Sequence, residues 1–471
     1  MFTRVSSIVV SMLLAAAAVG SAQPPFVRTV IVNSGGTPTA NGTALLNAIT
    51  NITTNSSNNT WLVKVEPGVF DLGSGTLTMK DYVDVEGSGR DVTFITSTQP
   101  WNGSSNLGTI TVPSSVHAEL RDLTVQNTNP TTQAVGVNTG SSNFSARAVN
   151  VLFPAAVSNS FAFFILSSSP TLTQIGIQMS SCGTSSQGIY SAWSSPTIKD
   201  LTITNQNTCG LNEATGVLLI GGSAVIDGVT ATVSGAQSDY GIRISNAATP
   251  LITNARLNVT GVSAAWGIRS YTGNCTFENL KITVSGGGSN YGIVFAGGPS
   301  TNSSVVRRAA ISVSGALSND GVYLVDNASA TLRDLDVRIS GAAGSQTAGV
   351  IGDYFNGGTS GNTVSIIDST VQASGGTTNV GIDATGTGNT FTIVRTTATA
   401  STGTSYGLAE SNTGNTFTLD HSQLSGGTDS VHLNSTFGAG ASQLAGPVFP
   451  LTGTCAACYN GSYNALSATC Q

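Results

Sequence analysis

Carboxylate side chains are the residues of this chain with the most evident chemistry, and they are scarce. Charged residues make up 8% of the 471 residues, and Asp and Glu together number 23. Hydrolysis of a glycosidic bond requires clustered carboxylates, because one donates a proton and another acts as base or nucleophile. The candidates for such a cluster are Asp353, Asp383 and Glu410, with Asp320 and Asp326 shortly before them.

Arginine and tyrosine side chains supply a second kind of candidate. Arg243 and Arg269 could neutralise the carboxylate of a uronate, which a polysaccharide lyase must do. Tyr190 and Tyr323 present aromatic rings, which favour the apolar faces of sugars. Candidate ligand-binding residues are therefore Tyr190, Arg243, Arg269, Tyr323 and Asp383. Catalytic residues stay unassigned, and neither a metal nor a cofactor is expected.

A repeated segment must position these residues. Between Gly241 and Gly349 each copy opens with Gly and an aliphatic residue, and the openers recur every 25 to 29 residues. A period of this size is typical of a solenoid. Read forward and backward from the clearest copies, the openers are Gly136, Ala162, Gly188, Gly216, Gly241, Gly267, Gly292, Gly321, Gly349, Gly381, Gly407 and Ser430.

Each copy has the pattern of short strands. Apolar and polar residues alternate in runs separated by Gly, Asn and Ser, and one copy holds about three such strands. No copy contains a helical run, and the leucine-rich and WD-type frames are absent. The sequence therefore predicts an all-β fold, a single-stranded right-handed parallel β-helix of about a dozen coils stacked ~4.8 Å apart.

Stacked coils place equivalent residues in rows. Inward rows should hold aliphatic residues, while the residue two after each opener should face outward. The outward row comprises Phe164, Tyr190, Leu218, Arg243, Arg269, Val294, Tyr323, Ile351, Asp383 and His432. A second row comprises Asp122, Asp200, Asp227, Asn254, Asn279, Asp334 and Asp368. Because Asp and Asn tolerate left-handed turns, we interpret this second row as turn residues in preference to a cation-binding row.

The two ends of the chain differ from the repeats. An apolar run from Ile8 to Val19 predicts a secretory signal peptide at 1–22. Residues 23–60 should form a first strand at 27–32 and a capping helix at 42–52, which would cover the open end of the β-helix at 61–445. Residues 446–471 should form a cysteine-containing cap or tail. The mature chain has no candidate membrane span.

The six cysteines fit an oxidising compartment, either the extracellular space, the cell surface or a periplasm. Two of them lie one repeat apart and are predicted to bridge adjacent coils, and a disulfide is predicted to hold the tail. The disulfide candidates are Cys182, Cys209, Cys455, Cys458 and Cys470, while Cys275 has no assigned partner. A net charge of −6 without a basic run argues against nucleic acid as a partner.

The stretch from Trp61 to Thr96 resembles the N-terminal coils of pectin methylesterases. The matching segments are WLVKVEPGVF at 61–70 and DYVDVEGSGRDVTFIT at 81–96. The resemblance covers roughly the first quarter of the chain. It implies the pectin lyase-like fold of that family, a right-handed parallel β-helix with an N-terminal capping helix.

The catalytic motifs of that family are missing. The resemblance implies two catalytic Asp residues and Gln residues that hold the oxyanion, but the segment 133–137 (QAVGV) matches the first Gln motif only in part. Ala155 and Ala156 stand where Gln and Asp are expected, and no carboxylate occurs between Asp122 and Asp200. We therefore expect no methylesterase activity by that mechanism.

Two functions remain, and whether the protein is an enzyme stays open at this point. The first is a secreted or surface-exposed β-helix with a binding or structural role, whose partner would be a polysaccharide or a cell-surface glycan. The alternative is a diverged polysaccharide-active enzyme, a lyase or a glycoside hydrolase of the pectin lyase-like fold.

Overall fold

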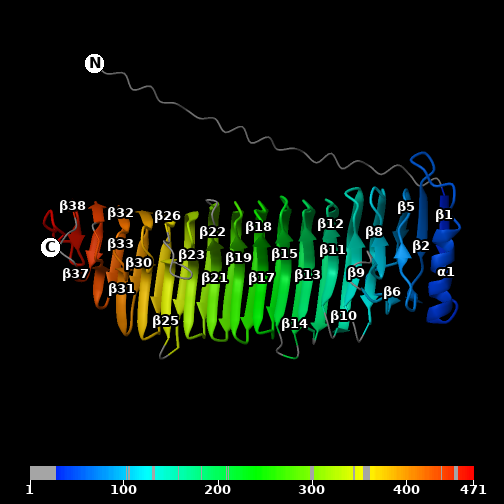
Figure 1. The fold of residues 1–471 in the computed structure, drawn as a ribbon, viewed down its shortest axis with the longest axis horizontal. Helices are drawn as coiled ribbons and strands as arrows, with labels where there is room; N and C mark the ends of the chain where they lie inside the picture. Colours follow the sequence, from blue (N-terminus) through cyan, green and yellow to red (C-terminus); the bar gives the residue numbers. More distant parts are fainter. Residues whose placement is uncertain are drawn as a thin grey trace, which may run out of the picture.

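The computed structural model describes residues 28–101, 103, 107–129, 133–156, 159–181, 183–207, 209, 212–297, 302–342, 345–353, 361–435, 437–449 and 454–470. The predicted signal peptide at 1–22 lies outside the described residues. The described chain forms an elongated parallel β-solenoid of about 13 turns, with helix α1 at its N-terminal end (Figure 1). The predicted all-β solenoid is thereby confirmed.

The strands form two parallel sheets. The 15-stranded sheet consists of β4 (Leu77–Thr78), β7 (Ile110–Val112), β9 (Ala134–Thr139), β11 (Ser160–Leu166), β13 (Ser185–Ala192), β15 (Glu213–Ile220), β17 (Ser238–Ser245), β19 (Ala264–Tyr271), β21 (Ser289–Ala296), β23 (Ser318–Val325), β25 (Gln346–Asp353), β28 (Thr378–Ala384), β31 (Thr404–Glu410), β34 (Asp429–His432) and β37 (Val448–Phe449).

The 24-stranded sheet consists of β1 (Arg28–Val32), β2 (Trp61–Val65), β3 (Gly68–Asp71), β5 (Val83–Glu86), β6 (Thr93–Ser97), β8 (Ala118–Asn127), β10 (Phe144–Ala156), β12 (Thr171–Ser181), β14 (Thr197–Asn207), β16 (Val225–Ser234), β18 (Leu251–Gly261), β20 (Thr276–Gly286), β22 (Asn302–Ser314), β24 (Ala328–Ser340), β26 (Thr363–Ile367), β27 (Thr370–Ser374), β29 (Thr390–Val394), β30 (Thr397–Ala400), β32 (Thr416–Asp420), β33 (Gln423–Gly426), β35 (Phe437–Gly440), β36 (Gln443–Ala445), β38 (Thr454–Ala456) and β39 (Tyr459–Asn460).

Each coil was predicted to hold about three strands. In the middle of the solenoid, the second and third of these are joined into one long bent strand, such as β14 or β24. Each such strand has a residue with a positive φ near its middle, and the Asp and Asn row supplies most of these residues, with φ between 55° and 57° at Asp122, Asp200, Asn254, Asn279 and Asp334. Asp368, with φ of 52°, lies between β26 and β27. The prediction was wrong for Asp227, because the left-handed residue of that coil is Gly228, with φ of 77°. Glycine adopts this conformation without steric cost, so the coil needs no Asp or Asn there.

The opening glycines set the distance between neighbouring coils. A Cβ atom on Gly241 would lie 2.5 Å from the carbonyl oxygen of Gly267, and one on Gly267 would lie 2.5 Å from that of Gly292. Since a Cβ cannot approach a backbone oxygen so closely, larger residues would push the coils apart. The repeated Gly therefore marks a point of close backbone contact.

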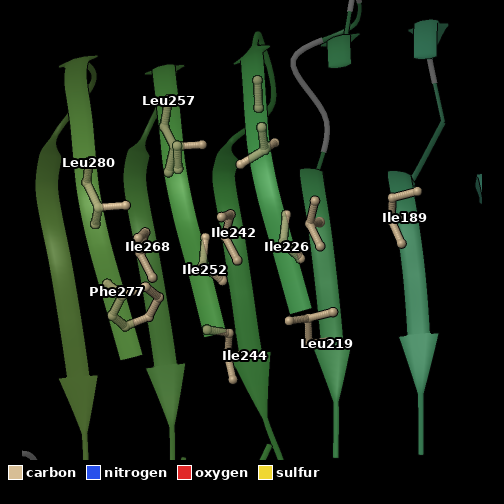
Figure 2. Close-up of a cluster of buried hydrophobic side chains, with 14 of the residues drawn as sticks. Ile189, Leu219, Ile226, Ile242, Ile244, Ile252, Leu257, Ile268, Phe277 and Leu280 are labelled. Atoms are coloured by element: carbon tan, nitrogen blue, oxygen red, sulfur yellow. The ribbon is translucent and has the colours of Figure 1, made fainter. Parts of the chain in front are cut away.

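Aliphatic side chains fill the interior in the predicted rows. Ile242, Ile268, Ile293 and Val322 occupy equivalent positions on four consecutive strands, and each is fully buried. Figure 2 shows Ile242 and Ile268 among neighbouring core residues such as Ile252 and Phe277. Each fully buried side chain of this kind contributes about 1.5–3 kcal/mol of transfer free energy.

The outward row is also confirmed by the strand register. Tyr190, Leu218, Arg243, Arg269, Val294, Tyr323, Ile351 and Asp383 align one after another along the 15-stranded sheet. Ala409 and His432 continue the row. Alternation with the buried aliphatic residues directs this row away from the core.

Helix α1 (Pro38–Thr50) lies across the N-terminal end of the solenoid. It begins four residues before the predicted start at 42, because the Thr37 side chain accepts a hydrogen bond from the amide of Ala40 and Pro38 occupies the first turn. Leu45 and Ile49 are buried against the first coils. No helix in the described part of the chain is long and apolar enough to cross a bilayer.

The C-terminal residues fold back onto the last strands. The amide of Cys455 donates to Ala468 O and that of Leu466 to Cys458 O, while a disulfide joins Cys455 to Cys470. The predicted tail disulfide is thus made by Cys455 and Cys470, and the prediction was wrong for Cys458, whose thiol is free and buried.

The other two disulfide candidates lie in the middle of the chain. Cys209 is disulfide-bonded, and Cys182, its predicted partner, lies outside the described residues. The thiol of Cys275 is free and buried.

Candidate functional site

A pocket of about 610 Å³ lies on the outer face of the 15-stranded sheet. Strands β21, β23, β25, β28, β31 and β34 supply its walls. These strands belong to the C-terminal half of the solenoid (Figure 1). Its acidic and aromatic residues are Tyr291, Asp320, Tyr323, Asp353, Asp383, Tyr406, Glu410 and His432. The pocket therefore gathers most of the carboxylates that the sequence singles out.

Three aspartates from three neighbouring strands face this pocket. Asp320 and Tyr323 belong to β23, Asp353 is the last residue of β25, and Asp383 lies on β28 in the same row as Tyr323. Asp320 is only 7% exposed, whereas Asp353 and Asp383 are partly exposed. The regular register thus brings together side chains that are up to 63 residues apart in sequence, from 320 to 383.

Burial and mutual repulsion favour protonation of two of these aspartates. Burial raises the pKa of Asp383 to about 7, and the nearby charge of Asp353 adds to this rise. Burial likewise raises the pKa of Asp320 to about 7, with contributions from Asp383 and Asp353. Like charges in a desolvated site are costly, so near neutral pH the cluster retains protons.

Asp353 differs from the other two because it accepts a phenolic hydrogen bond. The Tyr323 hydroxyl lies 2.8 Å from Oδ2 of Asp353. Burial, followed by this hydrogen bond and the charge of Asp353, raises the pKa of Tyr323. The phenol therefore stays protonated and donates to Asp353.

Glu410 lines the same pocket, but protein groups already occupy its carboxylate, and Asp326 lies outside the pocket lining. Glu410 aligns with the inward residue Ala384, and its carboxylate accepts hydrogen bonds from Asn415, from the amide of Asn434 and from both the amide and hydroxyl of Ser435. It thus holds the turn at 434–435 rather than facing a ligand. Asp326 lies at a turn with φ of 58° and is outside the pocket lining.

An aromatic row leads to the pocket from the N-terminal side. Tyr240, Trp266 and Tyr291 occupy equivalent positions on consecutive strands, and Asp320 takes the next position. The rings of Tyr240 and Trp266 stack 4.5 Å apart, and those of Trp266 and Tyr291 stack 5.9 Å apart. Because the ring faces cover one another, mainly their edges are left to line the outer surface.

The remaining predicted ligand-binding residues have different environments. Arg269 lies beside the aromatic row, with its guanidinium 5.0 Å from the Trp266 ring centroid. Arg243 forms a 2.6 Å ion pair with Glu213. Tyr190 stacks on Phe164 at 4.7 Å, so its ring face is already covered. Of the five predicted residues, Tyr323 and Asp383 line the pocket, and Arg269 lies two coils from Tyr323.

The sequence reasoning missed the aromatic row although a signal was present. Tyr240, Trp266, Tyr291 and Asp320 each directly precede an opening glycine. His432, which belongs to the predicted outward row, also lines the pocket, and its Nδ1 lies 2.8 Å from Oδ2 of Asp429, a pairing that the sequence did not indicate. Among the described residues, no group of three His, Cys, Asp or Glu side chains is arranged to hold a metal ion.

Comparison with known proteins gives no relative by sequence. No protein-family model and no curated protein matches the chain. Among solved structures, a pectin methylesterase from carrot is 14% identical, with a TM-score of 0.36 over 50% of this chain and 77% of its own.

Two further solved structures match over more of the chain. The mannuronan C-5 epimerase AlgE6 A-module from Azotobacter vinelandii is 15% identical, with a TM-score of 0.34 over 89% of this chain and 95% of its own. The catalytic domain of a GH87 alpha-1,3-glucanase in complex with nigerose is 10% identical, with a TM-score of 0.39 over 82% of this chain and 66% of its own. The chain's own strand register defines it as a parallel β-helix protein.

Proposed function

We propose that this protein hydrolyses glycosidic bonds of a polysaccharide bound along the outer face of the 15-stranded sheet. The observation that carries the proposal is the convergence of Asp320, Asp353 and Asp383 in one pocket. Two of these carboxyls have a raised pKa, and the third accepts a hydrogen bond from a protonated phenol. Glycoside hydrolysis requires a protonated acid and a second carboxyl group that acts as base or nucleophile.

Each aspartate has a separate role in this proposal. Asp383, partly exposed and protonated near neutral pH, donates its proton to the oxygen of the departing sugar. Asp353, held in place by the Tyr323 hydroxyl, acts on the sugar ring either through a water molecule or directly as a nucleophile. Asp320 lies deeper, and its own raised pKa keeps a second proton in the cluster, which limits the repulsion around Asp353.

The proposed location is outside the cytoplasm, at the cell surface or in the medium. The disulfide between Cys455 and Cys470 supports this location, because structural disulfides persist in oxidising compartments. A polysaccharide substrate is also found there. The predicted signal peptide at 1–22 remains part of the proposal.

The experiment is the release of reducing ends from a panel of neutral and acidic polysaccharides. We expect activity in the natural chain and a loss of at least about 100-fold in Asp383→Asn and in Asp353→Asn, since general acid or base catalysis contributes about 10²–10⁴-fold. Asp334→Asn is the matched control, because Asn254 and Asn279 occupy the equivalent left-handed positions. Activity that survives both pocket substitutions would refute the proposal.

A second candidate function is glycan binding without turnover. It is favoured by the aromatic row and Arg269, which extend over coils that lack the three aspartates. A protein that only binds would retain polysaccharides without releasing reducing ends or unsaturated uronates. In that case neither the natural chain nor Asp383→Asn would form products. The substitution would also change the affinity for the polysaccharide by no more than a small factor.

A further inference from the structure

Arg269 has an unusual environment for an arginine on a strand. Three aromatic rings surround its guanidinium, with centroids at 4.5 Å for Tyr271, 5.0 Å for Trp266 and 6.0 Å for Tyr240. The Tyr240 hydroxyl accepts a 3.2 Å hydrogen bond from Nη1. Cation–π contacts of this kind hold the charge in a fixed position and weaken its hydration.

The charge of Arg269 lacks an acidic partner in the part of the chain that the structure describes. Arg243, one coil away in the same row, is bound to Glu213 at 2.6 Å, whereas Arg269 forms no ion pair there. The Nε atoms of both arginines are buried without a hydrogen-bond acceptor, so the ion pair with Glu213 is what distinguishes Arg243 from Arg269. Guanidinium groups offer five donors in a planar fork that fits carboxylate and sulfate oxygens, so the unused donors indicate an acceptor from a ligand.

The position of Arg269 connects it with the carboxylate pocket. Arg269, Val294 and Tyr323 follow one another in the outward row, so Arg269 lies about 10 Å from Tyr323 along the solenoid axis, two strand spacings of ~4.8 Å. Tyr291 lies between them and belongs to the pocket lining. Burial above all raises the pKa of Tyr291, and the charges of Asp320 and Arg269 act on this phenol with opposite signs.

The positive and negative parts of the surface therefore belong to one continuous site. A glycan that reaches the three aspartates and extends toward the N-terminal coils passes over Tyr291 and Trp266 and then meets Arg269. The repulsion between an acidic sugar and the aspartates disfavours its binding in the pocket itself. Arg269, two coils away, is the position where an acidic group is stabilised.

We propose that Arg269 binds the acidic group of a sugar, a carboxylate or a sulfate ester, and thereby selects acidic glycans over neutral ones. The inference rests on the proposed function of this face of the solenoid and adds the class of substrate. The acidic sugar would lie two coils from the aspartates on the N-terminal side. A neutral sugar would occupy the pocket over Asp353 and Asp383.

The test compares the binding of charged and neutral polymers to the full chain. The probes are polygalacturonate, its carboxyl-reduced neutral form, dextran and dextran sulfate, measured by affinity gel electrophoresis. We expect the natural chain to prefer at least one acidic polymer, and Arg269→Gln to weaken that binding by about 10- to 100-fold, as for a lost charged hydrogen bond. Which acidic polymer binds distinguishes a carboxylate from a sulfate.

Arg256→Gln is the matched control. Arg256 is exposed on β18 of the 24-stranded sheet, so its substitution removes the same charge from a different face. Equal losses in both variants would indicate general electrostatic attraction and would overturn the proposal, as would unchanged binding by Arg269→Gln. Circular dichroism and thermal unfolding of each variant verify that the fold is intact.

These measurements distinguish a failure of the proposed function from a failure of this inference. If the natural chain cleaves none of the polymers but Arg269→Gln still loses acidic binding selectively, the acidic subsite stands and the hydrolase proposal fails. If the chain cleaves neutral polymers and Arg269→Gln cleaves them equally well with no preference for acidic ones, the hydrolase proposal stands and the subsite fails.

Discussion

The hydroxyl of Tyr323 donates a 2.8 Å hydrogen bond to Oδ2 of Asp353 on the next coil. This bond links two strands of the 15-stranded sheet across the floor of the pocket. The bond holds Asp353, one of three neighbouring carboxylates, in a fixed orientation. The phenol of Tyr323, which donates the proton of this bond, does not itself ionise near neutral pH.

Removal of this hydroxyl should therefore impair catalysis more than binding. Tyr323→Phe retains the ring next to Tyr291 but leaves Asp353 without its phenolic donor. We expect kcat to fall by about 10-fold or more while KM changes by less than about 3-fold, in line with a lost hydrogen bond to a charged group. Steady-state kinetics on a cleaved polysaccharide measures this. A larger rise in KM than fall in kcat would contradict the positioning role.

The proposed proton donor predicts a decline of activity at alkaline pH. Asp383, whose pKa is raised to about 7, must be protonated to act as an acid. Activity should therefore be retained below pH 7 and should fall as pH rises through about 7, up to tenfold for each further unit. The pH dependence of kcat/KM measures the apparent pKa of the carboxyl cluster. A rate that is constant from pH 6 to pH 9 would exclude Asp383 as the acid.

Asp239 predicts a pH-dependent loss of stability unrelated to the pocket. Asp239 is fully buried in the same inward row as Asn290, Asn319 and Asn379, and burial raises its pKa to about 7. The folded state therefore binds this proton more tightly than the unfolded state does. The contribution of protonated Asp239 to the free energy of unfolding should be complete below about pH 4. This contribution should be lost progressively as the pH rises to about 7.

Asp239→Asn should remove this pH dependence. Asn319 and Asn379 both accept from the backbone amide three residues earlier and donate to the carbonyl of that residue. The Asn variant can make the same pair of bonds with Ala236 and carries no charge. We expect it to be about 2–4 kcal/mol more stable than the natural chain at pH 8 and nearly equal to it at pH 4. Urea unfolding at both pH values measures this, and a difference that is the same at both would contradict it.

The disulfide between Cys455 and Cys470 predicts local stabilisation of the last coil. The two residues are 15 apart in sequence, and a loop of this size corresponds to about 3 kcal/mol in the chain-entropy model. In Cys455→Ala, the amides of the folded-back tail, including Cys470 and Leu466, should exchange with solvent faster. Cys275→Ala is the control, since that thiol is free and far from the tail. Equal exchange in the two variants would show that the disulfide is dispensable.

The repeat pattern predicted the fold because it reflects a backbone constraint. The openers such as Gly241 and Gly267 lie where neighbouring backbones meet, so a sequence spacing translates directly into strand register. Once the register is known, the alignment of Tyr323, Ile351 and Asp383 follows without further information. The left-handed turn residues are also predictable, except at Gly228, where glycine satisfies the same conformation.

The side-chain partnerships within the site could not be read in the same way. Arg243 and Arg269 are neighbours in one row, yet only the structure distinguishes the one that Glu213 neutralises from the one enclosed by aromatic rings. Glu410 resembles the pocket aspartates in sequence but lies on the inward side of its strand. The position of Glu410 depends on which side of its strand it occupies, whereas the environment of each arginine depends on which neighbouring side chains reach it.

The row through Arg269, Val294 and Tyr323 fixes the distance between the arginine and the acidic pocket. Each coil moves a residue of the row by one strand spacing of ~4.8 Å, so the distance from the arginine to the acidic pocket is counted in whole coils. Insertion of one complete coil between them would lengthen that distance by a single step. Under the proposed function, duplication of a repeat would therefore change in discrete steps the position along a chain of sugars at which the protein acts.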